Sequence, residues 1–170
     1  QMANLAAIVA NRGYYYIPHI VREIEGQDSL DTRFYQKQYT KVDAKHFDHI
    51  VEGMWRGVNK DGTCQGAYLK GLNVCGKTGT AQNSKGEDHS TFISFAPRNN
   101  PKIAIAVYVE NAGFGATWAA PVASLMVEKY LNGEIAQNRK YLEDRISQAN
   151  LLHKVPGSPN YVRPKKNKKK

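Results

Sequence analysis

Residues 74–82 constrain the fold of this chain most, because an apolar strand start leads there into a cation, two hydroxyls and a glycine. Thr78 and Thr80 are two positions apart, so an extended strand places both on one face. Gly79 carries no side chain and lets a ligand approach the backbone closely. Lys77 supplies a positive charge for an anionic group, and the N–H after Gly79 is available to an oxyanion. The segment therefore predicts one wall of an acyl-transfer site.

Two further strand patterns follow at short distances. Residues 91–96 and 103–109 are rich in apolar and β-branched side chains, and a turn with proline at both ends, residues 97–101, joins them. Strands with such short links pair as antiparallel neighbours. Residues 103–107 are wholly apolar, which predicts a central strand covered on both faces. Together the three strands predict an antiparallel meander.

Helical periodicity recurs in four stretches, which are residues 1–11, 44–58, 117–131 and 134–152. The second is the clearest, because Asp43 is a good N-cap and the apolar positions are spaced by three and four residues. Those positions are Phe47, Ile50, Val51, Met54, Trp55 and Val58. The fourth stretch is more polar and is predicted to be peripheral. Between the first two helices, residues 14–24 and 34–42 predict a hairpin.

The formal net charge of +9 belongs to the end of the chain. Seven of these charges come from residue 154 onward, where no acidic residue occurs, and the preceding residues carry only +2. Residues 156–170 are predicted to be a disordered basic tail. This tail is either a solubilising end or a contact for phospholipid and other anionic envelope polymers. Nucleic-acid binding is not predicted, because only Tyr161 is interleaved with the charges.

Cys64 and Cys75 are the only cysteines, and no metal-ligand spacing accompanies them, so neither a metal nor a cofactor is predicted. Two states are open for the cysteines: a disulfide in an oxidising compartment, or buried thiols beside residues 74–82. His46 and His49 are expected on a wet helix face, and His89 in a solvated loop.

The order of several segments resembles a known family. These segments are QMANLAAIVANRG at residues 1–13, VCGKTGTAQ at 74–82, HSTFISFAP at 89–97, IAIAVYVEN at 103–111 and AAP at 119–121. K-T-G is one of three motifs of penicillin-binding proteins and serine β-lactamases. Over residues 1–131 the chain resembles the C-terminal part of the transpeptidase domain of class B penicillin-binding proteins, in particular the elongation type, penicillin-binding protein 2.

The resemblance implies an α/β (α+β) fold in which helices cover an antiparallel sheet, as in penicillin-binding proteins and serine β-lactamases, here incomplete at its N-terminus. It also implies three parts of the chain. Residues 1–132 would be the C-terminal part of the transpeptidase domain, residues 133–155 a peripheral helical extension, and residues 156–170 the basic tail.

For function, the resemblance implies a serine-type peptidoglycan D,D-transpeptidase to which this chain supplies the Lys-Thr-Gly wall. Lys77 would lie beside the nucleophile and its proton network. Thr78, Gly79 and Thr80 would bind the carboxylate of a peptidoglycan stem peptide or of a β-lactam antibiotic. The Thr80 N–H would form half of the oxyanion hole.

No S-x-x-K occurs in the chain, and Ser158-Pro159-Asn160 matches S-x-N only after Lys77 rather than before it. The nucleophile is therefore expected upstream of Gln1, and the chain alone is expected to be inactive. Thr91 stands where many relatives have Trp, and Ser94 where many have Gly, which bears on the groove beside Lys77.

Two other functions stay open, namely a non-catalytic cell-envelope interaction module of the same fold, and a β-lactamase or D,D-carboxypeptidase with water as the acyl acceptor. The expected partners include the upstream remainder of the polypeptide and the cell-elongation machinery. The expected location is the periplasmic face of the bacterial inner membrane, with the anchor outside the chain and a membrane contact open to the basic tail. Apolar surface built to pack on absent elements predicts self-association of the isolated chain.

Overall fold

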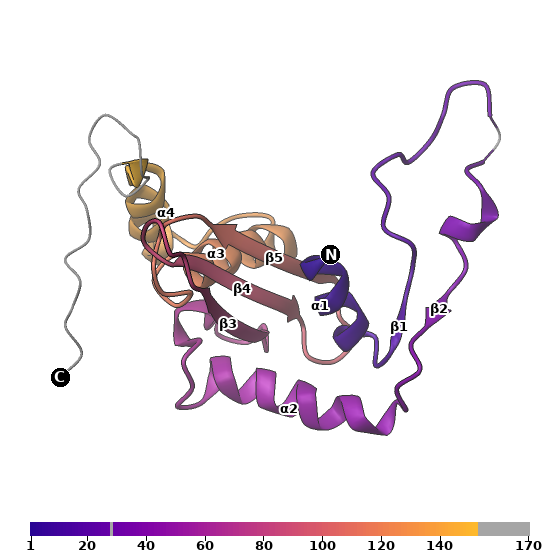
Figure 1. Ribbon diagram of the computed structural model, residues 1–170, viewed down its shortest axis with the longest axis horizontal. Coiled ribbons are helices and arrows are strands. Elements are labelled where there is room, and N and C mark those ends of the chain that lie inside the picture. The colour runs from indigo at the N-terminus through magenta and orange to yellow at the C-terminus, as the bar shows by residue number, and fades with distance from the viewer. Residues whose placement is uncertain (28, 153–170) are drawn as a thin grey trace.

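A three-stranded antiparallel sheet lies at the centre of the computed structural model, which describes residues 1–27 and 29–152 (Figure 1). The strands β3 (Cys75–Ala81), β4 (His89–Ala96) and β5 (Ile103–Val109) lie side by side in sequence order. The predicted meander is confirmed. Among the described strands, the prediction that residues 103–109 form the central one is wrong, because short links place each strand beside the next and so put β4 in the middle.

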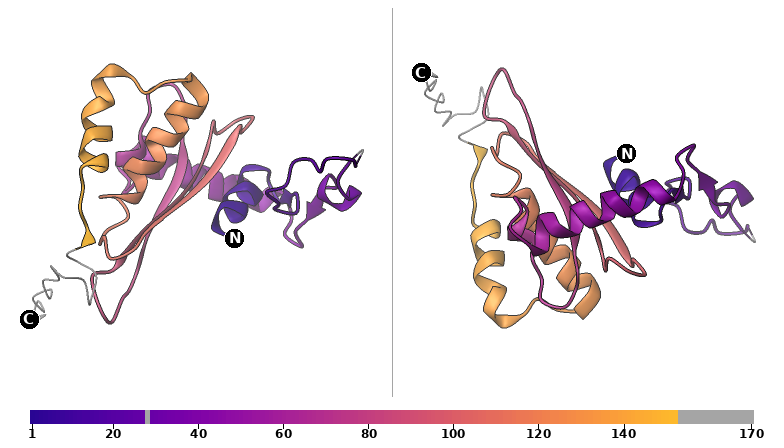
Figure 2. Two further views of the ribbon diagram at one scale, coloured as in Figure 1. Left: turned by 90° about the horizontal axis from the view of Figure 1, so that it is seen from above. Right: turned by 90° about the horizontal axis from the view of Figure 1, so that it is seen from below.

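Helices cover both faces of the sheet (Figure 2). On one face lies α3 (Ala119–Asn132); α1 (Met2–Ala10) and most of α2 (Lys45–Asn59) pack on the other. Side chains of β5 join both clusters, which explains its apolar sequence at an edge position. This layering confirms the predicted mixed α+β fold.

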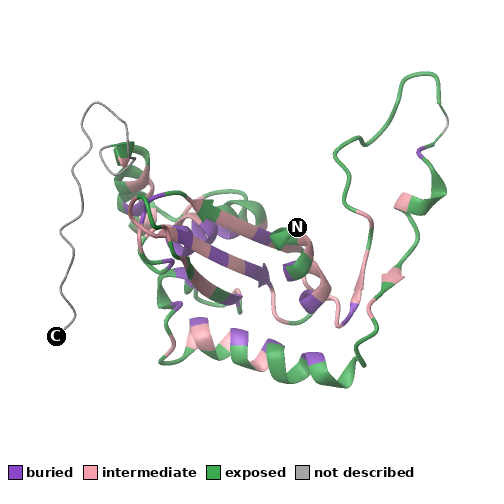
Figure 3. Cartoon of the chain, in the orientation of Figure 1, coloured by how far each residue is buried: buried purple, intermediate pink, exposed green. Residues whose placement is uncertain are grey.

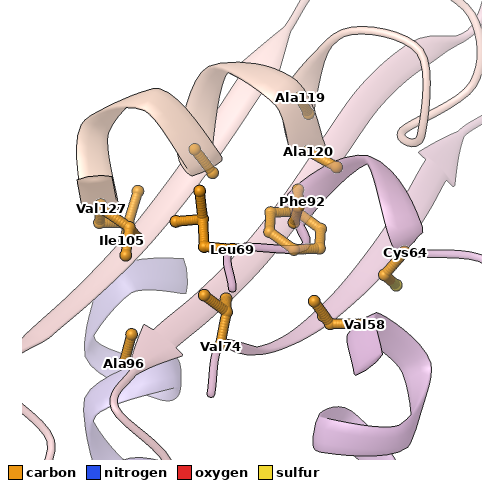
Figure 4. Close-up of a cluster of buried hydrophobic side chains, with 12 residues drawn as sticks. Val58, Cys64, Leu69, Val74, Phe92, Ala96, Ile105, Ala119, Ala120 and Val127 are labelled. Atoms are coloured by element: carbon orange, nitrogen blue, oxygen red, sulfur yellow. The ribbon is translucent and has the colours of Figure 1, made fainter. Parts of the chain in front are cut away.

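Two phenylalanines of β4 organise the two clusters. Phe92 and Phe95 are three positions apart, so their rings point to opposite faces, and both are fully buried. Phe92 packs with Ala119 and Ala120 of α3 (Figure 4). Phe95 packs with residues of α1 and α2. The central strand therefore contributes a large apolar side chain to each half of the core.

The helix α2 lies within one residue of its predicted bounds at each end. Asp43 was predicted to be the N-cap, but Ala44 occupies that position, and the Asp43 carboxylate accepts the Lys45 N–H at 3.1 Å from one residue earlier. The apolar positions Phe47, Val51, Met54 and Val58 are buried. Ile50 was predicted to belong to this stripe, but it lies at its margin and is exposed.

The segment between α1 and α2 departs most from its prediction. The predicted strands shrink to β1 (Tyr14–Tyr15) and β2 (Gln38–Tyr39), which pair antiparallel, with a 3-10 turn at Thr32–Phe34 between them. This arm projects from the body and is mostly exposed (Figures 1 and 3). Among the described residues no other strand pairs with it, so its β-propensity is not realised as a sheet.

Large apolar side chains are exposed on this arm, and we expect the isolated chain to self-associate through them. They are Tyr16, Ile20, Val21, Ile24, Tyr35, Tyr39 and Val42. Sedimentation velocity over a concentration series should show a mass that rises above that of the monomer. A chain that stays monomeric at high concentration and unfolds in one cooperative transition would contradict this expectation.

The C-terminal helix is shorter than predicted. Instead of one helix over residues 134–152, a 3-10 turn (Gln137–Arg139) leads into α4 (Lys140–Ser147). The α4 helix is mostly exposed, with Leu142 buried, in agreement with the expected peripheral position. The predicted disordered tail, residues 156–170, lies outside the described residues. Within the described part of the chain, no helix has the length and apolar character needed to cross a bilayer.

A close approach between β3 and β4 yields a prediction for stability. A methyl group added at Gly76 would overlap the buried ring of Phe92, whereas one added at the exposed Gly53 of α2 would meet no atom within 4 Å. Overpacking a core costs about 1–3 kcal/mol, so we expect Gly76→Ala to lower the free energy of unfolding by about 2 kcal/mol. Gly53→Ala should raise it by about 0.5–1 kcal/mol through helix propensity. Urea titration of both variants tests this, and equal midpoints would contradict it.

Candidate acyl-transfer wall

The strand β3 turns the amide of Thr78 away from β4. The Thr78 N–H donates to Cys64 Sγ at 3.3 Å, and the Thr78 carbonyl accepts from Lys77 Nζ at 2.6 Å. Neither partner belongs to β4, so both groups face the other edge of the strand. Because peptide directions alternate along an antiparallel strand, the Thr80 N–H faces that edge too. It is therefore directed as the oxyanion-hole prediction requires.

Other elements cover only the first half of this edge. Gly57, near the end of α2, lies so close that a methyl group on it would be 3.4 Å from the Gly76 carbonyl and 3.8 Å from Cys64 Sγ. The loop that follows α2 brings in Cys64, whose N–H donates to the Gly57 carbonyl at 3.0 Å. Past Thr78 no described residue bonds to this edge, which leaves the part of β3 around Thr80 open.

The side chains of the wall alternate as predicted. Thr78 and Thr80 lie on one face of β3, and Lys77 lies on the other with Gly79. Lys77 and Thr80 are exposed and Thr78 is half-buried. The Lys77 ammonium nonetheless reaches the open edge, because its side chain folds back to the Thr78 carbonyl. One cation, two hydroxyls and one N–H thus surround the same stretch of edge.

Gly79 lies at a crowded point of the main chain. Thr91 of β4 lies directly opposite Gly79, and a methyl group on Gly79 would overlap the Thr91 hydroxyl. Gly115, in the loop before α3, packs on the main chain of both residues, and a side chain there would overlap their carbonyls. Packing therefore requires a glycine at this position of the motif, and the access of a ligand to its backbone stays a prediction. Thr91, which departs from the family pattern, is a direct neighbour of the motif.

Two serines of β4 lie behind the wall. Ser90, opposite Thr80, donates to the Phe114 carbonyl at 3.0 Å and accepts the Ala119 N–H at 3.1 Å. It joins the loop before α3 to the strand and was not predicted, since nothing in its sequence context distinguishes it. Ser94, opposite Gly76, is fully buried, and its hydroxyl has no hydrogen-bond partner among the described residues.

Both cysteines are free and buried. They pack in different clusters, Cys64 with the α3 side and Cys75 with the α1 side, so of the two states left open the structure has the thiols. Burial raises the pKa of the Cys75 thiol to about 12. His89 does not lie in a loop as expected: it opens β4, its Nδ1 accepts the Asn111 N–H at 3.0 Å, and its ring contacts Tyr108.

The family model described as the penicillin binding protein transpeptidase domain matches residues 1–128. The chain belongs to this transpeptidase family. Within the family it is 35% identical over 162 residues to the peptidoglycan D,D-transpeptidase MrdA of Haemophilus influenzae. The matched region covers 83% of this chain and 25% of that protein. It is 32% identical over 143 residues to PbpA of Mycobacterium tuberculosis, covering 78% of this chain and 29% of that protein.

Solved structures agree on the transpeptidase fold. A crystal structure of Pseudomonas aeruginosa PBP2 in complex with WCK 5153 matches with a TM-score of 0.62 and 35% identity, over 80% of this chain and 30% of that one. A ceftriaxone acyl-enzyme of penicillin-binding protein A from M. tuberculosis matches with a TM-score of 0.62 and 28% identity, over 76% of this chain and 31% of that one. The resemblance to penicillin-binding protein 2 is confirmed, and the chain spans less than a third of each of these relatives.

Proposed function

We propose that this chain forms the Lys-Thr-Gly wall of a serine-type peptidoglycan D,D-transpeptidase whose nucleophilic serine lies on another part of the polypeptide. The observation that carries the proposal is the direction of the Thr78 amide, which leaves the Thr80 N–H on an open strand edge. Relatives named as peptidoglycan D,D-transpeptidases support the reaction class. The 170 residues contain no S-x-x-K, so the chain alone is not acylated.

The proposed chemistry is transfer of an acyl group between two stem peptides. The upstream serine adds to a carbonyl of the donor stem peptide, and the negative charge that develops on the carbonyl oxygen is stabilised by the Thr80 N–H. The amine is expelled with a proton and leaves an acyl-serine ester. The amine of a second stem peptide then attacks this ester, loses a proton and releases the serine. A β-lactam would enter the same site and acylate the same serine.

Each residue of the wall has one role in this scheme. The Lys77 ammonium holds the proton network beside the serine and attracts the anionic substrate. The hydroxyls of Thr78 and Thr80 donate to the substrate carboxylate from one face of the strand. Gly79 lets the substrate backbone lie along the edge. The proposed site of action is the periplasmic face of the inner membrane, in contact with the cell-elongation machinery.

Labelling of source cells with a fluorescent penicillin tests the proposal. The membrane fraction is separated on a gel and probed with an antibody raised against residues 43–131. We expect one band, much larger than the 19.0 kDa of this chain, to carry both the fluorescent label and the antibody. An antibody-positive species without label would reject the enzyme and favour a non-catalytic interaction module of the same fold.

A further inference from the structure

A short loop between α2 and β3 brings two more side chains to the wall. Thr63 and Cys64 lie in this loop, and both contact Thr78, which is fifteen positions after Thr63 and fourteen after Cys64. The Thr63 hydroxyl lies 3.3 Å from the Thr78 hydroxyl. Cys64 Sγ accepts the Thr78 N–H at 3.3 Å and lies 3.7 Å from the Thr78 hydroxyl. Neither residue belongs to the K-T-G motif.

We propose that Thr63 is a third hydroxyl of the carboxylate site and determines preference for anionic substrates, and that Cys64 is the residue that positions Thr78. This inference rests on the proposed transpeptidase function and extends it to two residues outside the motif. The ligand class is the same: a stem peptide or β-lactam with a free carboxylate.

The contact between the two hydroxyls supports a direct role for Thr63. Thr63 is exposed, and its hydroxyl lies within hydrogen-bond distance of the Thr78 hydroxyl, which the wall offers to a carboxylate. A carboxylate accepts several hydrogen bonds through two oxygens, so neighbouring hydroxyls suit it. A hydrogen bond to a charged group contributes about 1.5–3 kcal/mol, more than one between neutral groups. Thr63 is therefore placed to distinguish an anionic ligand from a neutral one.

The thiol of Cys64 controls the direction of the Thr78 groups. Its sulfur accepts the Thr78 N–H, so Thr78 has no main-chain donor left for the substrate. Its S–H points toward the Thr78 oxygen and occupies one acceptor site there, which leaves the hydroxyl proton free to turn outward. Cys64 is fixed in turn by its own N–H bond to the Gly57 carbonyl at 3.0 Å. A fully buried thiol thus sets the donor direction of a half-buried hydroxyl.

The test compares two probes in the full-length polypeptide, with acylation rate constants measured for benzylpenicillin and for its neutral methyl ester. Thr63→Val removes the hydroxyl at constant shape, and Thr63→Ser keeps it. We expect Thr63→Val to slow acylation by benzylpenicillin about tenfold and acylation by the ester less than about twofold, since one hydrogen bond to a charged group is lost. Thr63→Ser should keep the preference of the wild type. For Cys64, we expect alanine to reduce the preference and serine to retain it.

Three outcomes would overturn the inference. If Thr63→Val slows both probes equally, Thr63 only supports the loop. If Cys64→Ala leaves the ratio of the two rate constants unchanged, Cys64 does not position Thr78. If the wild-type polypeptide is acylated by neither probe, the proposed transpeptidase function fails, and this inference fails with it. The first two outcomes leave the proposed function intact, so the two failures are distinguishable.

Discussion

Replacement of Lys77 by glutamine in the full-length polypeptide is expected to lower the rate constant of acylation by benzylpenicillin by about 10²–10⁴-fold, the range typical of a lost proton-transfer group. The ammonium reaches the open edge of β3, where it bonds to the Thr78 carbonyl at 2.6 Å. Glutamine is neutral and donates hydrogen bonds, but it cannot give or take a proton as we propose for Lys77. Lys77→Arg should restore little, because a planar guanidinium does not replace a compact ammonium. Stopped-flow acylation gives the rate constant directly.

The matched control is Lys102→Gln. Lys102 is also exposed, and it lies in the turn between β4 and β5, at the opposite end of β4 from Thr80 and its partner Ser90. The same charge is removed, so a general effect of net charge would appear in both variants. We expect the control to acylate within about twofold of the wild type. Equal losses in the two variants would show that Lys77 acts only through the overall field.

Replacement of Arg139 by methionine is expected to lower the free energy of unfolding by about 3 kcal/mol, because it strands a buried carboxylate. The Glu128 side chain is only 5% exposed, and it accepts from Arg139 Nε at 2.8 Å. The same guanidinium donates to Ser124 Oγ at 2.6 Å. Once Arg139 is removed, the Ala136 N–H, at 3.3 Å, is the one hydrogen-bond donor to Glu128 that remains among the described residues. Urea titration measures the loss.

Lys140→Met provides the control one position away. Lys140 pairs with Glu143 at 3.2 Å on the exposed surface of α4, where such pairs contribute about 0–1 kcal/mol. A double variant, Glu128→Leu with Arg139→Met, should recover much of the lost stability, because apolar side chains replace both charges. If Arg139→Met is no more destabilised than Lys140→Met, the Glu128 pair does not hold the C-terminal extension on α3.

The elements that were predictable from sequence are those whose signal is local. The α2 helix has apolar residues at helical spacing and a carboxylate before its first turn, and its bounds were predicted to within one residue. Phe92 and Phe95 lie in a strand whose links to both neighbours are short. Residues 14–42 carry the same residue types as a sheet, but β-propensity requires partner strands, and the arm provides only one short pair. The central position of β4 depended on pairing order, which apolar content does not reveal.

For the site, the alternation of side chains along a strand was enough to place Thr78 and Thr80 together and Lys77 opposite them. The direction of the peptide groups was not, because it depends on which neighbour the strand pairs with. Thr63 and Cys64 were missed as site residues for a different reason: they lie in an irregular loop and reach Thr78 only because Gly57 lets that loop approach β3. A contact of this kind leaves no periodic signal in the sequence.

The division of the core into two clusters, one on each face of the sheet, affects the order of folding. The strands β3, β4 and β5 and the helix α3 follow one another along the chain, so their contacts close short loops and form quickly. The helix α1 packs against a strand about a hundred positions further on, which is a slow, non-local contact. We therefore expect the cluster that contains Phe92 and α3 to form before the cluster that contains Phe95 and α1. Cys64 belongs to the first and Cys75 to the second, so the two thiols should lose access to reagents at different times as the chain folds.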